Sequence, residues 1–249
     1  MAEAATARRD PQRRIVLREQ LDTLRQRDDA PPAAEALIAI AAQAAEGPLA
    51  VGQLGQTLDG RIATVTGHSQ YVNGPAALDH LHRLRALADA VVVGAGTVMA
   101  DNPALTVRRV EGDNPVRVIL DPRGRVPRDR TVFTDGRAPT LVAGTADLPV
   151  GRDGDGSLPP RAVLDALAGI GLAVVLVEGG ADTVSRFLAA GCLDRLHLLV
   201  APTLLGSGRP GITLPDVATM EGAMRLRART YPLGIDTLFD LTPRIPIAG

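Results

Sequence analysis

Two segments of the chain place glycines between an apolar run and a helical run. In the first, residues 91–108, Gly94 follows the apolar run and Gly96 directly precedes Thr97. Backbone N–H groups at such a turn can hold a phosphate, and the Thr97 hydroxyl could add a donor. A tight strand-to-helix turn without a ligand is the alternative interpretation.

Two charged residues follow in the same loop. Asp101 could orient a hydroxyl or an amide of a cofactor, and Arg108 could clamp a phosphate through two parallel hydrogen bonds. Taken without the surrounding pattern, the two residues would be interpreted as a solvated surface pair.

The second segment, residues 174–188, places Glu178 and two glycines between a buried strand and a helix. Gly179 and Gly180 would let the backbone approach a ligand closely, at a helix N-terminus that attracts anions. A carboxylate is costly to bury alone, so Glu178 must either reach a polar ligand or cap a neighbouring group.

A third segment, residues 55–75, is rich in turn-forming and polar residues. Asp59-Gly60 alone predicts an ordinary turn, but Thr66 to Tyr71 add hydroxyls, a histidine and one of the two tyrosines. Such a cluster favours a polar substrate. Arg85, late in the following helix, would by itself be interpreted as a partner of the helix dipole.

Alternating strands and helices must position these segments. Because alternation of this kind forms parallel sheets, we predict an α/β fold: a mostly parallel sheet, helices on both faces and an antiparallel C-terminal edge. The carboxyl ends of the strands are where ligands bind in such sheets. The expected strands are 49–54, 90–94, 115–121, 139–144, 173–180, 193–202, about 224–231 and 235–241; the expected helices begin at 75, 161 and 181.

Residues 1–47 differ in composition from the rest. Leu17, Leu21 and Leu24 have helical spacing, and a second helical pattern, 33–45, follows a proline pair. We expect residues 1–47 to be a helical extension packed on the domain or on a partner subunit, and residues 48–249 to form one domain.

The composition excludes several classes of function. Lys and Arg total 27 against 28 Asp and Glu, which argues against nucleic-acid or membrane-surface binding. A single cysteine, Cys192, and four scattered histidines predict no metal site. Since the N-terminus lacks a secretory pattern and no apolar run approaches about 18 residues, we expect a cytoplasmic protein.

Four ordered runs together resemble the reductase domain of bifunctional riboflavin-biosynthesis proteins, the RibD C-terminal family. The runs are TLDGRIATVTGHSQYVNGP, LRALADAVVVGAGTVMADNPALTVR, PVRVILDPRGRVP and VEGGADTVSRFLAAGCLDRLHLLVAPTLLGSG, and the resemblance covers about residues 48–242. It implies a dihydrofolate-reductase-like fold and a homodimer. It also implies NADPH-dependent reduction of the ribosyl group of 5-amino-6-(5-phosphoribosylamino)uracil to a ribityl group.

The resemblance also implies roles for particular residues. Substrate contacts fall on Ser69, Arg85, Leu105, Arg108 and Glu178, with the arginines on the phosphate and Glu178 on the pyrimidine edge. NADPH contacts fall on Tyr71, Thr97, Asp101 and the segment from Gly180 to Arg186, which includes Ala181, Asp182 and Thr183. To these sets we add Gln53 for the substrate, and Thr57, Gly94, Gly96 and Gly179 for the cofactor.

The implied mechanism is direct hydride transfer to the sugar C1′, with the protein mainly positioning donor and acceptor. Asp101 and Glu178 are the ionisable candidates for catalysis, and a bound water is an equal alternative as proton donor.

The sequence departs from the family in two places. Many members have a lysine, thought to meet the pyrimidine carbonyl, where this chain has the uncharged Gln53. The zinc deaminase signature that precedes the reductase in bifunctional members is absent, so we expect a stand-alone reductase.

Two other functions stay open. Gln53 permits a reductase of another heterocycle, such as a dihydropterin-like compound or a different aminopyrimidine. A noncatalytic nucleotide-binding or structural subunit is disfavoured, because a scaffold needs none of Thr97, Asp101, Arg108 and Glu178. For the homodimer, the sequence offers one apolar late strand, 193–201, that could pair across an interface.

Overall fold

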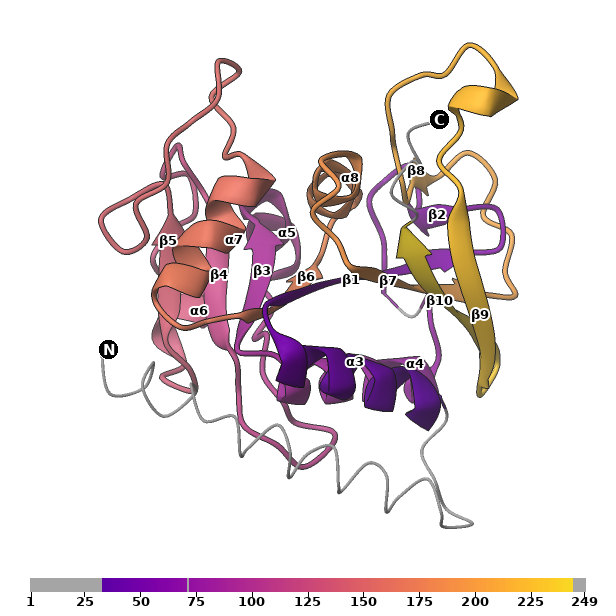
Figure 1. Ribbon diagram of the computed structural model, residues 1–249, viewed down its shortest axis with the longest axis horizontal. Coiled ribbons are helices and arrows are strands. Elements are labelled where there is room, and N and C mark those ends of the chain that lie inside the picture. The colour runs from indigo at the N-terminus through magenta and orange to yellow at the C-terminus, as the bar shows by residue number, and fades with distance from the viewer. Residues whose placement is uncertain (1–32, 71, 244–249) are drawn as a thin grey trace.

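The computed structural model describes residues 33–70 and 72–243 (Figure 1). Leu17, Leu21, Leu24 and Tyr71 therefore lie outside the described residues. The helices are α3 (Ala34–Glu46), α4 (Pro75–Leu87), α5 (Ala95–Asp101), α6 (Thr131–Thr134), α7 (Pro160–Gly169), α8 (Ala181–Ala189) and the 3₁₀ turn η1 (Met220–Gly222). The strands are β1 (Leu49–Thr57), β2 (Arg61–Ala63), β3 (Ala90–Gly94), β4 (Val116–Leu120), β5 (Thr140–Ala143), β6 (Val174–Glu178), β7 (Arg195–Ala201), β8 (Arg209–Pro210), β9 (Leu226–Leu233) and β10 (Asp236–Pro243).

The centre of the fold is an eight-stranded sheet in the order β5-β4-β3-β6-β1-β7-β10-β9. The strands from β5 to β7 are parallel, whereas β10 pairs antiparallel with β7 and with β9. This arrangement confirms the predicted α/β class and the antiparallel C-terminal edge. A separate pair, β2 with β8, was not predicted, because each strand is only two or three residues long.

Apolar side chains on both faces of the sheet hold the helices in place. Val163 of α7 and Phe187 of α8 pack on one face, while Ile40 of α3, Leu84 of α4 and Val98 of α5 pack on the other. Figure 1 shows α3 and α4 together beneath the sheet, α8 above it, and α7 in front of β3 and β4. The buried apolar side chains are aliphatic apart from Phe187 and Cys192, as the composition predicts. The hydrophobic contribution to the stability of the fold therefore comes mainly from aliphatic surface.

The second helical pattern of the N-terminal segment is α3, and it belongs to the core. Leu37 and Ile40 are buried in the same cluster as Leu49 and Val51 of β1. Helix α3 therefore packs on the sheet of its own chain.

Two details of the strands differ from expectation. Strand β1 continues to Thr57, beyond the predicted end at residue 54, because its backbone pairs with β7 as far as Ala201. The expectation that segment 193–201 could pair across an interface is wrong, since β7 lies between β1 and β10 and is paired on both sides.

Each helix of residues 33–70 and 72–243 is too short or too polar to cross a membrane.

Candidate active site

A first cavity lies at the carboxyl end of β6, beside the second half of β1. It has a volume of about 380 Å³, and its walls include Gln53, Arg85, Leu105 and Glu178. Gln53 and Glu178 are paired neighbours in the parallel register of β1 and β6. Side chains of paired residues in adjacent strands point to the same face, so the amide and the carboxylate lie next to each other facing α4.

Arg85 and Glu178 form a buried ion pair in this cavity. Nε and Nη2 of Arg85 each donate to one Glu178 oxygen at 2.7 Å, and Nη1 donates to the Thr106 carbonyl at 3.0 Å. The side chains are only 7% and 6% exposed. Glu178 therefore caps a neighbouring group while it also faces the cavity, and Arg85 is an ion-pair partner instead of a partner of the helix dipole.

The loop after α5 brings Leu105 into the same wall. Leu105 is buried with a φ of 53°, a left-handed conformation that is uncommon for a non-glycine residue. Such a conformation persists only where the surroundings determine it, and it is frequent at ligand sites.

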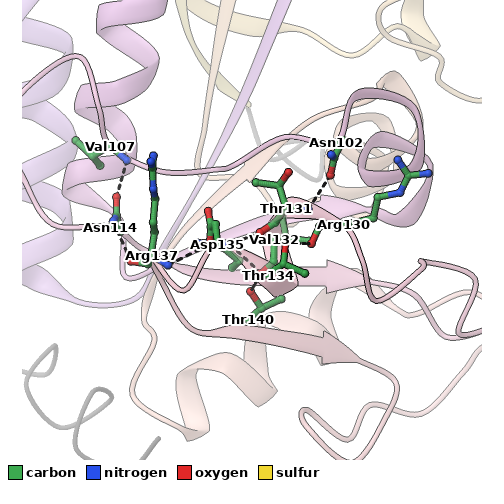
Figure 2. A network of polar contacts seen from close by, with 11 residues as sticks. Asn102, Val107, Asn114, Arg130, Thr131, Val132, Thr134, Asp135, Arg137 and Thr140 are labelled. Atoms are coloured by element: carbon green, nitrogen blue, oxygen red, sulfur yellow. Dashed lines mark hydrogen bonds and ion pairs between the residues drawn. The ribbon is translucent and has the colours of Figure 1, made fainter.

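Polar contacts fix this loop at both ends (Figure 2). Asn102 Oδ1 accepts the Thr131 N–H at 2.8 Å, and Asn114 Oδ1 accepts the Val107 N–H at 2.7 Å. Asn114 Nδ2 also donates to the Arg137 carbonyl at 3.1 Å. The segment between Asp101 and Arg108 is thus held against α6 and the start of β5.

The two glycine loops meet each other. The Gly180 N–H donates to Thr97 Oγ1 at 3.0 Å. Gly179 has a φ of 114°, and a Cβ on it would lie 3.1 Å from Thr97 Oγ1. A Cβ on Gly94 would lie 2.6 Å from Thr183 Oγ1, which is closer than real contacts allow. Side chains at these positions would collide with the two threonines, so the glycines let the two loops pack closely against each other.

The two packed loops line a second cavity of about 1280 Å³. The first turns of α5 and α8 form part of its wall, where backbone N–H groups favour an anion. The two cavities share Ile62, Ser69, Thr97, Asp101 and Gly180. A ligand in each cavity would therefore meet at this shared wall.

Asp101 stands at the junction. Part of its side chain is exposed, but neighbouring protein atoms remove water from the carboxyl and raise its pKa above the usual value. A raised pKa makes the protonated form of a carboxyl easier to populate, as a proton donor requires.

The turn after β1 is a self-contained network. Thr57 is 1% exposed; its hydroxyl donates to Asp59 at 2.5 Å, and its oxygen accepts the Arg61 N–H at 2.9 Å. Asp59 also accepts the N–H groups of Leu205 and Gly206. The hydrogen bond from Thr57, followed by those from the backbone, lowers the pKa of Asp59 to about 2. The network therefore ties the 58–60 turn to the loop after β7.

Most of the residues predicted for the site line the two cavities. The first cavity is lined by Gln53, Arg85, Leu105, Glu178 and Gly179, and the second by Gly94, Gly96, Ala181, Asp182, Thr183 and Arg186; Ser69, Thr97, Asp101 and Gly180 line both. Gly96 lies within the first turn of α5 and not in the loop before it. Thr57 and Arg108 line neither cavity. The Arg108 side chain is exposed, and its backbone N–H donates to His82 Nδ1 at 3.1 Å.

Several lining residues escaped the sequence analysis. Asn73 donates to Asp236 Oδ1 at 3.2 Å and lines the first cavity, while Arg123, Arg125 and Arg209 line the second. The run PRGR at 122–125 follows a predicted strand and was a signal for the first two arginines. Among the described residues, no group of three or more His, Cys, Asp and Glu side chains is placed to hold a metal ion.

The fold and the two cavities define an α/β protein with a polar site at the carboxyl ends of parallel strands, next to a helix N-terminus that can bind an anion. Residues 50–231 match the family described as the RibD C-terminal domain. The chain belongs to this family.

Individual relatives agree with this assignment. The chain is 36% identical over 214 residues to the 2,5-diamino-6-ribosylamino-4(3H)-pyrimidinone 5′-phosphate reductase of Methanothermobacter thermautotrophicus, covering 78% of this chain and 98% of that protein. It is 38% identical to the riboflavin biosynthesis protein RibD of Bacillus amyloliquefaciens, covering 69% of this chain and 49% of that protein. The solved structure of Acinetobacter baumannii RibD has a TM-score of 0.69 at 31% identity, covering 80% of this chain and 59% of that one. The chain thus spans about half the length of the RibD proteins.

Proposed function

We propose that this protein is an NADPH-dependent reductase of a ribosylaminopyrimidine 5′-phosphate, the step of riboflavin biosynthesis that converts a ribosyl into a ribityl group. The observation that carries the proposal is the pair of cavities that meet at Thr97, Asp101 and Gly180. A hydride donor in one cavity and its acceptor in the other would be in contact there.

The second cavity fits a dinucleotide. Its wall includes backbone at Gly94, Gly96 and Gly180, and the nine-residue helix α8 begins beside it. A pyrophosphate would be held by backbone N–H groups at this helix N-terminus. When bound, the nicotinamide supplies the hydride.

The first cavity fits a polar heterocycle. The Glu178 carboxylate accepts hydrogen bonds, Arg85 donates them, and Gln53 can do both. Ser69 lies on the shared wall, where a sugar would sit between the base and the hydride donor. We assign the substrate phosphate to Arg85 and Arg108, as the family resemblance implies; Arg85 lines the first cavity, and Arg108 follows in the loop whose Leu105 lines it.

During the reaction the substrate gains one hydride and one proton. In the open-chain imine of the substrate, C1′ would accept the hydride that the nicotinamide supplies, and the imine nitrogen would take the proton. Asp101 is the candidate donor of that proton, directly or through a water. Both oxygens of Glu178 accept hydrogen bonds from Arg85, which suits Glu178 to binding.

Two pyrimidines are candidate substrates, and they differ at C2. 5-Amino-6-(5-phosphoribosylamino)uracil presents a carbonyl there, while the 2,5-diaminopyrimidinone presents an amino group. The relative that this chain covers almost completely is named for the second compound. Gln53 supports both, since an amide donates to a carbonyl through its nitrogen and accepts from an amino group through its oxygen.

The proposal is tested by incubating the purified protein with NADPH and each pyrimidine phosphate, with dihydrofolate as the competing heterocycle. We expect NADPH oxidation and a ribityl product, seen by mass spectrometry, with at least one of the two pyrimidines. If NADPH were oxidised with dihydrofolate but with neither pyrimidine phosphate, the proposed substrate would be wrong and dihydrofolate would take its place. NADPH binding with no turnover of any of these compounds would favour a noncatalytic nucleotide-binding subunit.

A further inference from the structure

Asn73 is a polar residue of the first cavity that none of the roles assigned above uses. It lies just before α4 and is half-buried. Its Nδ2 donates to Asp236 Oδ1 at 3.2 Å and to the Leu199 carbonyl at 3.4 Å. A carboxylate and a carbonyl accept hydrogen bonds and do not donate them, so the amide nitrogen must face these two groups. The amide oxygen, Oδ1, is therefore turned the other way.

Asp236 holds this arrangement in place from outside the cavity. It is the first residue of β10 and only 2% exposed, and its Oδ2 accepts the N–H of Gly74 at 2.8 Å. Gly74 is the residue before the first turn of α4, where the helix dipole stabilises a carboxylate. Asn73 thus follows a backbone that is tied to β10, and its amide cannot turn over without losing its two acceptors.

Gly55 explains where the Asn73 oxygen lies. A Cβ on Gly55 would overlap Asn73 Oδ1, so only glycine leaves room for this side chain on β1. Both residues line the first cavity. Within residues 33–70 and 72–243, Asn73 Oδ1 accepts no hydrogen bond. The cavity therefore contains an acceptor of fixed position and direction that a ligand can use.

Gln53 lies on the same face of β1 and differs from Asn73 in one respect. Among the residues that the structure describes, no hydrogen bond fixes the Gln53 amide, so this residue can present either its oxygen or its nitrogen. Positions 53 and 55 are about 7 Å apart along the strand, because a strand rises about 3.3 Å per residue. A pyrimidine that meets Gln53 at one end would meet Asn73 toward its other end.

We propose that Asn73 Oδ1 accepts a hydrogen bond from the 5-amino group of the pyrimidine and selects substrates that carry this group. The proposal rests on the proposed function, which places C2 of the pyrimidine at Gln53. C5 is opposite C2 in the ring, and both candidate substrates have an amino group there. The C4 carbonyl only accepts, and the nitrogen on C6 carries the reacting C1′. The 5-amino group is thus the donor that suits a fixed acceptor at Asn73.

The test is a calorimetric titration with two ribityl compounds, which measures binding and needs no turnover. One is the expected product, 5-amino-6-(5-phosphoribitylamino)uracil, and the other is the same compound with hydrogen at C5. We expect the wild-type protein to bind the 5-amino compound about three- to tenfold more tightly, the usual net effect of a hydrogen bond between uncharged groups. Asn73→Ala should bring the ratio of the two Kd values close to one.

A second variant displaces the same amide without removing it. In Gly55→Ala the new methyl group takes the space of Asn73 Oδ1, so this variant should also lose the discrimination. Combining Gly55→Ala with Asn73→Ala should cause no further change in the ratio. The contrasting variant is Asn114→Ala, which frees the Val107 N–H and loosens the loop that carries Leu105. It should weaken binding of both compounds by the same factor.

Three outcomes would count against the inference. Equal affinity of the wild-type protein for the two compounds would overturn it without any variant. A Kd ratio in Asn73→Ala as large as that of the wild-type protein, including an equal loss for both compounds, would assign Asn73 a structural role only. If the wild-type protein bound neither compound, the proposed pyrimidine substrate itself would be wrong, and the inference would fall with it.

Discussion

The buried pair of Arg85 and Glu178 is the residue-scale feature on which the first cavity depends. Each carboxylate oxygen receives one N–H at 2.7 Å, and both side chains are almost completely buried. Removing one member of a buried pair leaves the other charge without compensation, which costs about 3 to 5 kcal/mol.

We therefore predict that Glu178→Gln lowers the free energy of unfolding by about 3 kcal/mol or more, measured by denaturant titration. The control is Asp79→Asn, which breaks the 2.6 Å pair with Arg109, where the side chains are 37% and 33% exposed. Exposed pairs contribute about 1 kcal/mol at most, so this control should change little. Equal effects of the two substitutions would contradict the assignment of Glu178 to a buried pair.

Gln53 is the residue that we expect to govern the choice of pyrimidine. An ammonium only donates hydrogen bonds, so Gln53→Lys should favour the C2 carbonyl of the uracil and disfavour the C2 amino group of the diaminopyrimidinone. We predict a shift of about tenfold or more in the ratio of kcat/KM values toward the uracil, measured with both substrates. An unchanged ratio would place the C2 edge of the pyrimidine away from Gln53.

At the scale of elements, the meeting of the two glycine loops is the decisive contact. Gly179 has a φ of 114°, and the neighbouring Gly180 N–H is bonded to Thr97. Gly179→Ala would strain the backbone and press a methyl group against Thr97. We predict a loss of stability of about 1 to 3 kcal/mol together with weaker NADPH binding. Gly169→Ala, at the end of α7 with open space around its Cα, is the matched control and should leave NADPH affinity unchanged.

The apolar runs of the sequence were sufficient to predict the eight strands of the main sheet. Runs such as AVVVG and VVLVE are apolar without interruption, as strands buried on both faces must be, and Pro75 correctly marks the first residue of α4. The length of β1 was underestimated, because pairing with β7 extends it through a polar stretch. The short strands β2 and β8 leave no periodic signal.

The site was predictable in part. The glycine positions and the acid after β6 follow local rules for turns and helix N-termini, so their placement in the cavities could be expected. The partnership of Arg85 with Glu178 joins residues 93 positions apart, and no local pattern specifies it. No local pattern reveals the role of Thr57 either. Its hydroxyl could contact a ligand, but in the structure it bonds to Asp59 and Arg61 and closes a turn.

At the scale of the whole molecule, buried histidines make folding sensitive to acid. Burial, then His197 and Arg83, hold the pKa of His80 well below the usual range, and burial with nearby Arg85 lowers that of His82 to about 4. Both residues lie on the buried side of α4. Their depressed pKa values mean that, between the unfolded-state pKa near 6.5 and about 4, the unfolded chain binds protons that the folded chain does not.

We predict that stability is constant above about pH 6.5 and falls as the pH decreases toward 4, by up to about 1.4 kcal/mol per pH unit for each histidine. Denaturant titrations across this range measure the slope. His82→Gln, which keeps an acceptor for the Arg108 N–H, should reduce the slope, whereas His68→Gln on the exposed turn should not. If the unfolding free energy of the His82 variant depended on pH as steeply as that of the wild-type protein, the attribution of the slope to His82 would be wrong.

We also propose that the protein is a homodimer, as the family resemblance implies. Since β7 is paired on both sides, its backbone cannot pair with a partner subunit; β9 is one of the two edge strands of the sheet, and most of its residues are exposed. Light scattering should give twice the chain mass of 26.0 kDa, and the single-chain mass would reject the dimer.

The central claim is direct hydride transfer between the two cavities. It is tested most directly by turnover with NADPH that carries deuterium at the transferred position, followed by mass spectrometry and NMR of the product. The account predicts a ribitylaminopyrimidine phosphate with one deuterium, located at C1′. A product without deuterium at C1′, or no product from either pyrimidine phosphate while NADPH binds, would contradict it.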